Sequence, residues 1–90
     1  MTSYIGIVHK DSGSDLSLSF PDFPGCITAG RDMPELQWMA EEALAFHVEG
    51  MLEDGEQIPK PSTLEAVMLD PDYSDGVPIL VPLRSAVLAQ

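Results

Sequence analysis

The chain has 90 residues, which is enough for one small domain and too short for two, and its single cysteine excludes an internal disulfide. Fifteen acidic residues face only four basic ones, giving a net charge of −11. Direct binding of nucleic acid by this chain is therefore not expected, because phosphate contacts need clustered lysine and arginine. The acidity suits a basic protein partner, and it also serves simple solubility.

The amino-terminal residues, MTSYIGIVHKD, lack the basic start and the long apolar run of a signal peptide. No apolar stretch approaches the roughly 20 residues that a helix needs to span a bilayer. The sequence therefore predicts a cytoplasmic protein that does not contact the membrane.

Three strands are predicted in the first third of the chain. Residues 4–9 (YIGIVH) are rich in strand-forming residues, and residues 10–14 are typical of a hairpin loop. Residues 15–20 then alternate, with Leu16, Leu18 and Phe20 on one side, which predicts a half-buried antiparallel strand. A third strand is predicted over residues 26–31.

The segment FPDFPGC, residues 20–26, lies between the second and third strands. Pro21 and Pro24 restrict its backbone, Gly25 permits a positive φ, and Phe23 can fold back over the end of the sheet. These features predict a structural corner.

Cys26 ends this corner, and a reactive thiolate there would need a nearby base or a helix amino terminus. The chain has two histidines as possible bases, His9 and His47. Because a small, weakly polar side chain at the start of a strand normally packs inward, we interpret Cys26 as a core residue.

A long helix is predicted from Asp32 to about Asp54. Asp32 can cap the first backbone N–H groups, Pro34 fits the first turn, and Glu35 stands at the capping-box position. Gly55 supplies the stop.

At 100° per residue, one arc of this helix is apolar and is predicted to cover the sheet. Gly50, in the middle of the arc, is predicted to allow a close approach by a strand or a bulky side chain. His47 is expected to find a partner at Ser17, Ser19 or a backbone carbonyl. The arc consists of Leu36, Met39, Ala40, Ala43, Leu44, Phe46, His47, Gly50 and Met51.

The opposite arc is acidic and carries an aromatic residue, Trp38. Between Met33 and Asp54 there are six carboxylates and no basic residue, so the charge repulsion is not relieved within the helix. We interpret this arc as a contact surface for a partner, because large aromatics outside the core are enriched at interfaces. Simple solvation, self-association, or packing of Trp38 on a neighbouring loop remain alternatives. The arc consists of Gln37, Trp38, Glu41, Glu42, Val48, Glu49, Leu52 and Glu53.

The last third of the chain predicts a short helix and a final strand. Ser62 and Glu65 repeat the capping pattern, so a helix is predicted over residues 63–69. Residues 77–83 (VPILVPL) are predicted to form a strand that lies at a sheet edge or has its prolines on the unpaired side, because prolines donate no hydrogen bond. An open edge invites pairing with a second copy, so we expect a homodimer or higher homo-oligomer. Its edge residues would be Ile79, Leu80 and Val81.

These elements predict an α+β fold in which one helical layer covers a small sheet. Catalytic or metal chemistry finds little support. The aspartates at 22, 32, 70, 72 and 75 stand at turns or caps that already explain them, and no phosphate loop, GxSxG or HExxH motif is present. Two histidines and one cysteine match no zinc spacing. We therefore expect no enzyme, no metal and no cofactor.

Two segments, FPDFPGCITAG and EEALAFHVEGMLEDGEQIPKPS, resemble the HicB antitoxin family of bacterial and archaeal HicA–HicB toxin–antitoxin systems. The likeness covers about residues 4–83. It implies a partial RNase H-like fold, with strands one to three as an antiparallel meander and the fourth strand parallel to the first. The carboxylate set of RNase H enzymes does not map onto this chain, so the resemblance implies no nuclease activity.

HicB-like proteins neutralise HicA, a small basic mRNA-cleaving toxin, so the resemblance implies a toxin partner and inhibition by occlusion. We expect Trp38 and Leu52 to supply apolar contact area. The carboxylates expected to pair with toxin cations are Glu41, Glu42, Glu49 and Glu53. The alternative is an orphan homo-oligomeric scaffold or regulatory domain without a toxin.

Many family members carry a carboxy-terminal DNA-binding domain of the helix-turn-helix or ribbon-helix-helix type. Seven residues follow Leu83 here, too few for either module, so we expect a single domain and no specific operator binding.

Overall fold

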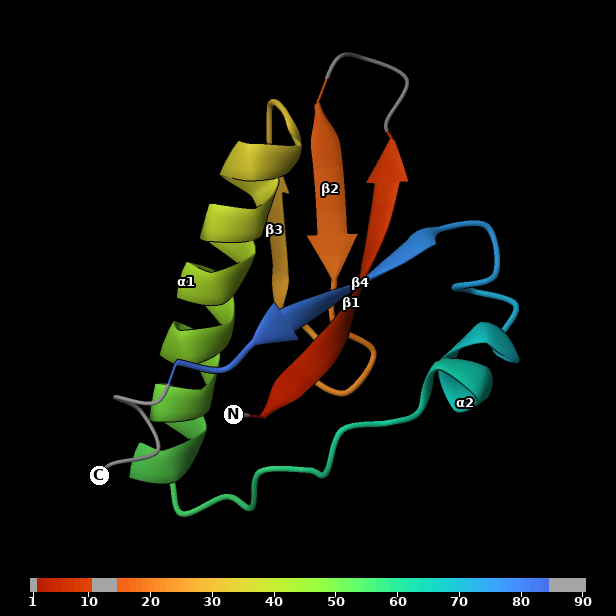
Figure 1. Ribbon diagram of the computed structural model, residues 1–90. Helices are drawn as coiled ribbons and strands as arrows, with labels where there is room; N and C mark the ends of the chain where they lie inside the picture. The colour runs from red at the N-terminus through yellow and green to blue at the C-terminus, as the bar shows by residue number, and fades with distance from the viewer. Residues whose placement is uncertain (1, 11–14, 85–90) are drawn as a thin grey trace.

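The computed structural model describes residues 2–10 and 15–84. Its elements run in the predicted order, so the predicted type and sequence of elements are confirmed; the predicted hairpin loop lies mostly outside the described residues (Figure 1). The elements are β1 (Ser3–Lys10), β2 (Leu16–Ser19), β3 (Ile27–Gly30), α1 (Met33–Glu53), α2 (Leu64–Met68) and β4 (Val77–Pro82).

The sheet has the strand order β3-β2-β1-β4, and every neighbouring pair is antiparallel. Leu18 of β2 pairs with Val8 of β1 and with Thr28 of β3. The α+β class and the antiparallel meander of the first three strands are therefore confirmed.

The predicted parallel direction of β4 is wrong, because Val77 pairs with Val8 and Pro82 pairs with Ser3. The reason lies in the connection. α1 carries the chain from the end of β3 to the opposite end of the sheet, and the segment containing α2 then carries it back (Figure 1). β4 consequently starts where β1 ends, and the crossover rule for parallel strands does not apply.

β4 lies at an edge of the sheet, as its prolines predicted. Pro78 and Pro82 have no N–H, so their pairs with Ile7 and Ser3 are of the non-hydrogen-bonded kind. Leu80 lies two residues from each proline, so its backbone N–H and C=O also point away from β1, toward the open edge of the sheet. Between residues 78 and 82 the open edge therefore offers one N–H donor, flanked by two prolines.

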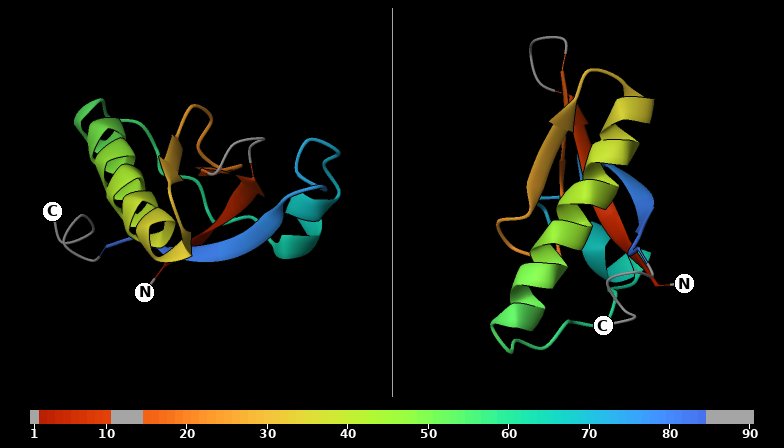
Figure 2. Two further views of the ribbon diagram at one scale, coloured as in Figure 1. Left: turned by 90° about the horizontal axis from the view of Figure 1, so that it is seen from above. Right: turned by 90° about the vertical axis from the view of Figure 1, so that its left-hand side faces the viewer.

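The sheet is covered on both faces. Tyr4 and Val8 of β1 pack in the main core beneath α1, whereas Ile5 and Ile7 alternate to the other face and pack with Val67 of α2. In the right-hand view of Figure 2, α1 lies in front of the sheet and α2 behind it. The structure thus adds a small second helical layer to the single layer predicted.

The inward face of α1 differs from the predicted arc. Val48, placed on the outward arc, is fully buried, while Phe46, expected to cover the sheet, has 79% of its surface exposed. The buried residues of α1 follow one i, i+4 row, which turns by about 40° around the helix at each step. A helix that crosses the sheet obliquely buries such a row. The row consists of Leu36, Ala40, Leu44 and Val48.

The close approach predicted at Gly50 is also wrong, because Gly50 is exposed and a Cβ there would meet no atom within 4 Å. The close approach occurs at Gly30 instead. A Cβ on Gly30 would lie 2.7 Å from the backbone nitrogen of Leu36, so glycine lets β3 end directly against the first turn of α1.

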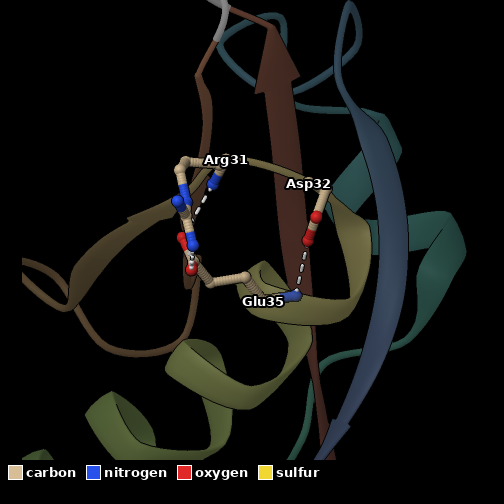
Figure 3. A network of polar contacts seen from close by, with 3 residues as sticks. All are labelled: Arg31, Asp32 and Glu35. Atoms are coloured by element: carbon tan, nitrogen blue, oxygen red, sulfur yellow. Dashed lines mark hydrogen bonds and ion pairs between the residues drawn. The ribbon is translucent and has the colours of Figure 1, made fainter.

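The predicted bounds of α1 are confirmed by its caps at Asp32 and Asp54. Figure 3 shows the amino-terminal end of the helix. The Asp32 carboxylate accepts a hydrogen bond from the Glu35 backbone N–H at 2.9 Å. The Glu35 side chain does not complete the box at Asp32; it accepts from the backbone N–H of Arg31 at 2.9 Å and pairs with its guanidinium at 3.0 Å. Gly55 follows the helix with a φ of +74°, the left-handed conformation typical of a helix end.

α2 is capped by Thr63, whose hydroxyl accepts from the Ala66 N–H at 3.2 Å. Ser62, the predicted cap, has a different partner, described below. No helix in the described part of the chain is long and apolar enough to cross a membrane.

Candidate functional site

The outward face of α1 presents the aromatic and acidic side chains that the sequence singled out. Trp38 is 57% exposed and Leu52 is also exposed. Glu49 and Glu53 are exposed. The predicted solvent exposure of these residues is confirmed, and their contact with a partner stays a prediction.

Two of the predicted glutamates have partners within the chain. Glu42 pairs with the guanidinium of Arg84 at 2.9 Å, and Glu41 accepts a hydrogen bond from the Gln37 amide at 3.2 Å. Both glutamates are partly exposed, and an exposed pair of this kind contributes little to stability. A cationic partner would therefore compete with Arg84 for Glu42 at low cost, whereas Glu49 and Glu53 form no ion pair within the described residues.

The carboxy-terminal end of α1 is electrostatically negative. Its last turn contains no basic residue, and the helix dipole places partial negative charge there. Among the described ion pairs, Arg31 is engaged by Glu35 and Arg84 by Glu42. The charge of this end of the helix is therefore not balanced by an ion pair among the described residues.

Phe46 is the exposed aromatic that the sequence analysis missed. It lies on the flank of α1 beside a depression of about 490 Å³ between the helix and the corner after β2. Its place on the apolar arc gave no sign of this exposure, which depends on the direction in which α1 crosses the sheet. The depression is lined by Asp22, Phe23, Pro24, Phe46, His47, Gly50, Met51, Asp54 and Glu56.

The corner itself has the predicted form. Gly25 has a φ of +89°, and Phe23 is buried as a plug whose ring meets the Tyr4 ring edge-on at 4.8 Å. The loop is closed by hydrogen bonds from the Phe23 N–H to the Phe20 carbonyl and from the Cys26 N–H to the Phe23 carbonyl. This rigid corner forms one wall of the depression.

The expected hydrogen bond between His47 and Ser17 or Ser19 is absent among the described residues. The His47 ring packs edge-on against Phe23, with 5.7 Å between the ring centroids, and the Ser17 hydroxyl donates to the His9 carbonyl instead. His47 also lines the depression.

Cys26 is 5% exposed and its Sγ lies 3.7 Å from the Ala43 carbonyl oxygen. Burial raises the pKa of the thiol to about 11, so the nucleophilic thiolate is disfavoured at neutral pH. These observations favour the interpretation as a core residue. In residues 2–10 and 15–84 no three His, Cys, Asp or Glu side chains are grouped in a way that would hold a metal ion.

The corner is joined to the segment that follows α1. The Asp22 carboxylate accepts hydrogen bonds from the backbone N–H and the hydroxyl of Ser62, and the Tyr4 hydroxyl donates to the Pro59 carbonyl. The two segments that carried the family resemblance are thus in direct contact.

The predicted oligomer edge is only partly exposed. Leu80 is 66% exposed, but Val81 is fully buried and Ile79 packs against the main core, so Val81 cannot serve as an edge contact. Leu80 borders an uncharged depression of about 290 Å³ on the α2 side of the sheet. Its lining is Ser3, Ile5, Ser62, Leu64, Pro78, Ile79 and Leu80.

Comparisons with known proteins find similar chains among solved antitoxin structures. The crystal structure of the Burkholderia pseudomallei antitoxin HicB matches with a TM-score of 0.83 and 32% identity, over 97% of this chain and 67% of that one. A chain of the HicA3 and HicB3 toxin–antitoxin complex matches with a TM-score of 0.77 and 27% identity, over 92% of this chain and 99% of that one.

A protein of Haemophilus phage HP1 (strain HP1c1), described as an uncharacterized 14.9 kDa protein of the rep-hol intergenic region, is 44% identical over 64 residues. The match covers 71% of this chain and 48% of the phage protein, so this chain spans about half the length of that relative. The family model for the HicB-like antitoxin of bacterial toxin–antitoxin systems matches residues 4–90. The chain therefore belongs to the HicB-like antitoxin family.

Proposed function

We propose that this chain is an antitoxin that binds a small basic HicA-like toxin and neutralises it by covering the surface with which the toxin binds RNA. The observation that carries the proposal is the outward face of α1, where Trp38 is 57% exposed and, further along the helix, the exposed Glu49 and Glu53 form no ion pair within the described residues. The family membership supports the same function.

Charge and shape both favour a basic protein on this face. Glu49 and Glu53 present carboxylates without an ion-pair partner in the described residues. Leu52 supplies apolar area beside them, and Trp38 supplies it nearer the start of the helix. Complementary charge steers two proteins together, while a buried aromatic supplies much of the affinity. Glu41 and Glu42 complete the surface, and Glu42 exchanges Arg84 for a toxin cation.

Occlusion requires a rigid surface and no reactive group. α1 has 21 residues and is therefore about 30 Å long, comparable to the width of a small domain. Its inward row is fully buried, so the outward side chains stand on a fixed support. A helix of this length covers much of one face of a small toxin.

The test is co-expression with a small basic HicA-like protein encoded beside this gene, read out as growth rescue and co-purification. The unmodified chain should rescue growth and co-purify. Trp38→Ala combined with Leu52→Ala should lose both. Leu69→Ala, which removes an exposed leucine beyond α2, is the matched control and should behave as the unmodified chain. Failure of the unmodified chain to co-purify with the toxin would refute the proposal.

A homo-oligomeric scaffold is the second candidate, and the exposed Leu80 beside an uncharged depression favours it. A chain with a net charge of −11 repels its own copies, so self-association is best tolerated where charges are absent. Leu80→Lys should then shift a dimer to monomer in light scattering, without affecting toxin binding. A chain that is monomeric at all concentrations would exclude this candidate.

A further inference from the structure

We propose that the depression between α1 and the corner binds an arginine side chain of the partner protein. The inference rests on the proposed function and extends it, because this site lies beside, and not within, the surface centred on Trp38. The depression has a volume of about 490 Å³, ample for one guanidinium group and its aliphatic stem.

The walls of the depression offer the two kinds of contact that a guanidinium group makes. Phe46 lines the depression, and with 79% of its surface exposed it is available for stacking. Met51 and Pro24 also line the depression, and a methylene stem can pack against them. Gly50 keeps the floor open, since a Cβ at this position would meet no atom within 4 Å.

The rim supplies the charge. Asp54 and Glu56 line the depression at the end of α1, where the helix dipole is also negative, and the lining includes no lysine or arginine. Asp22 lines it too, although its carboxylate is already held by Ser62. Among the described residues that line the depression, the two exposed carboxylates therefore have no lysine or arginine beside them.

Arginine fits this arrangement better than the other ligands that a concave surface attracts. Phosphate groups are excluded by the carboxylates, and a purely apolar side chain would desolvate them without compensation. A lysine ammonium could neutralise the rim, but it lacks the planar group that stacks on an exposed ring while donating several hydrogen bonds. A basic toxin carries the residue that this site would take.

The experiment measures the affinity of the purified toxin for three variants by calorimetry at two salt concentrations. Phe46→Ala should weaken binding at least tenfold. Asp54→Asn combined with Glu56→Gln should weaken binding and reduce its dependence on salt. Leu69→Ala truncates a similarly exposed apolar residue that does not line the depression, and it should bind as the unmodified chain does.

The thermal midpoint of each variant distinguishes a loss of binding from a loss of folding. The Asp54→Asn and Glu56→Gln changes remove carboxylates that oppose the helix dipole, so the thermal midpoint should stay equal or rise while affinity falls. Replacing each toxin arginine by alanine should identify one whose effect disappears in the Phe46→Ala background. Binding of both variants within twofold of the unmodified chain would overturn this inference and leave the proposed function standing. If the unmodified chain does not bind the toxin, this inference and the proposed function are both refuted.

Discussion

The Asp22 carboxylate holds Ser62 by two hydrogen bonds, one from the backbone N–H at 2.9 Å and one from the hydroxyl. This contact fixes the segment after α1 to the corner between β2 and β3, and the Tyr4 hydroxyl fixes the same segment at Pro59. The chain is thereby carried past the end of the sheet to its second face. The antiparallel direction of β4 follows from this route.

Removing the Asp22 carboxylate should destabilise the fold. Asp22→Ala is expected to lower the free energy of unfolding by about 1.5–3 kcal/mol, the range for hydrogen bonds to a charged group, and Ser62→Ala by about 1 kcal/mol. Urea denaturation measures both, and the double variant should cost less than the sum of the single ones. Asp72→Ala, at an exposed turn, is the control and should change little. Equal stability of the Asp22 and Asp72 variants would show that the contact is unimportant.

Cys26 should give the fold an alkaline pH dependence. Burial raises the pKa of the folded thiol to about 11, from 9.0 in the absence of the fold. The unfolded chain therefore releases this proton first, and stability should fall as pH rises from about 9 to 11. Cys26→Ala should lack this part of the decline. Denaturation at pH 8, 9.5 and 11 measures it, and parallel curves for the two proteins would contradict the burial of the thiol.

The amino-terminal end of α1 should respond to acid and to loss of its cap. Asp32→Ala is expected to cost about 1 kcal/mol of stability.

Hydrogen bonds from Arg31 lower the pKa of Glu35 below 4.5. The contribution of Glu35 to stability is therefore present above pH 4.5 and is lost as pH falls through the folded pKa. Glu35→Gln should remove this acid-dependent part. Thermal denaturation between pH 3 and 6 gives the comparison, and an unchanged acid dependence would contradict the ion pair.

Two glycine variants should have opposite effects on stability. Gly30→Ala places a Cβ 2.7 Å from the Leu36 backbone nitrogen, and such overpacking should cost about 1–3 kcal/mol. Gly50→Ala adds a methyl group in open space within α1 and should stabilise the fold by about 0.5–1 kcal/mol. The thermal midpoints of the two variants, each compared with that of the unmodified chain, measure these changes in stability. A stabilising Gly30→Ala would mean that β3 and α1 are less tightly packed than the structure shows.

Local signals were sufficient to predict most of the elements from the sequence. The alternation of Leu16, Leu18 and Phe20, the cap at Asp32 and the stop at Gly55 each act within a few residues, and each is confirmed. The corner around Phe23 was predicted for the same reason, because the prolines and Gly25 dictate its backbone.

Properties that depend on distant contacts could not be predicted in this way. The direction of β4 depends on how the chain travels between residues 54 and 76, and the hydrogen bonds of Asp22 and Tyr4 that guide it join segments far apart in sequence. The misplacement of Phe46 and Val48 has a similar origin. Both are apolar, and only the oblique crossing of α1 over the sheet decides which of them is buried.

The dependence of toxin affinity on salt tests the central claim most directly. Glu49 and Glu53 lie on the outward face of α1 and form no ion pair in the described residues, so reversing their charge leaves the fold intact. We predict that Glu49→Lys combined with Glu53→Lys weakens toxin binding at least tenfold at low salt. The affinity of this variant should also depend less on salt concentration. An affinity and a salt dependence equal to those of the unmodified chain would contradict the account.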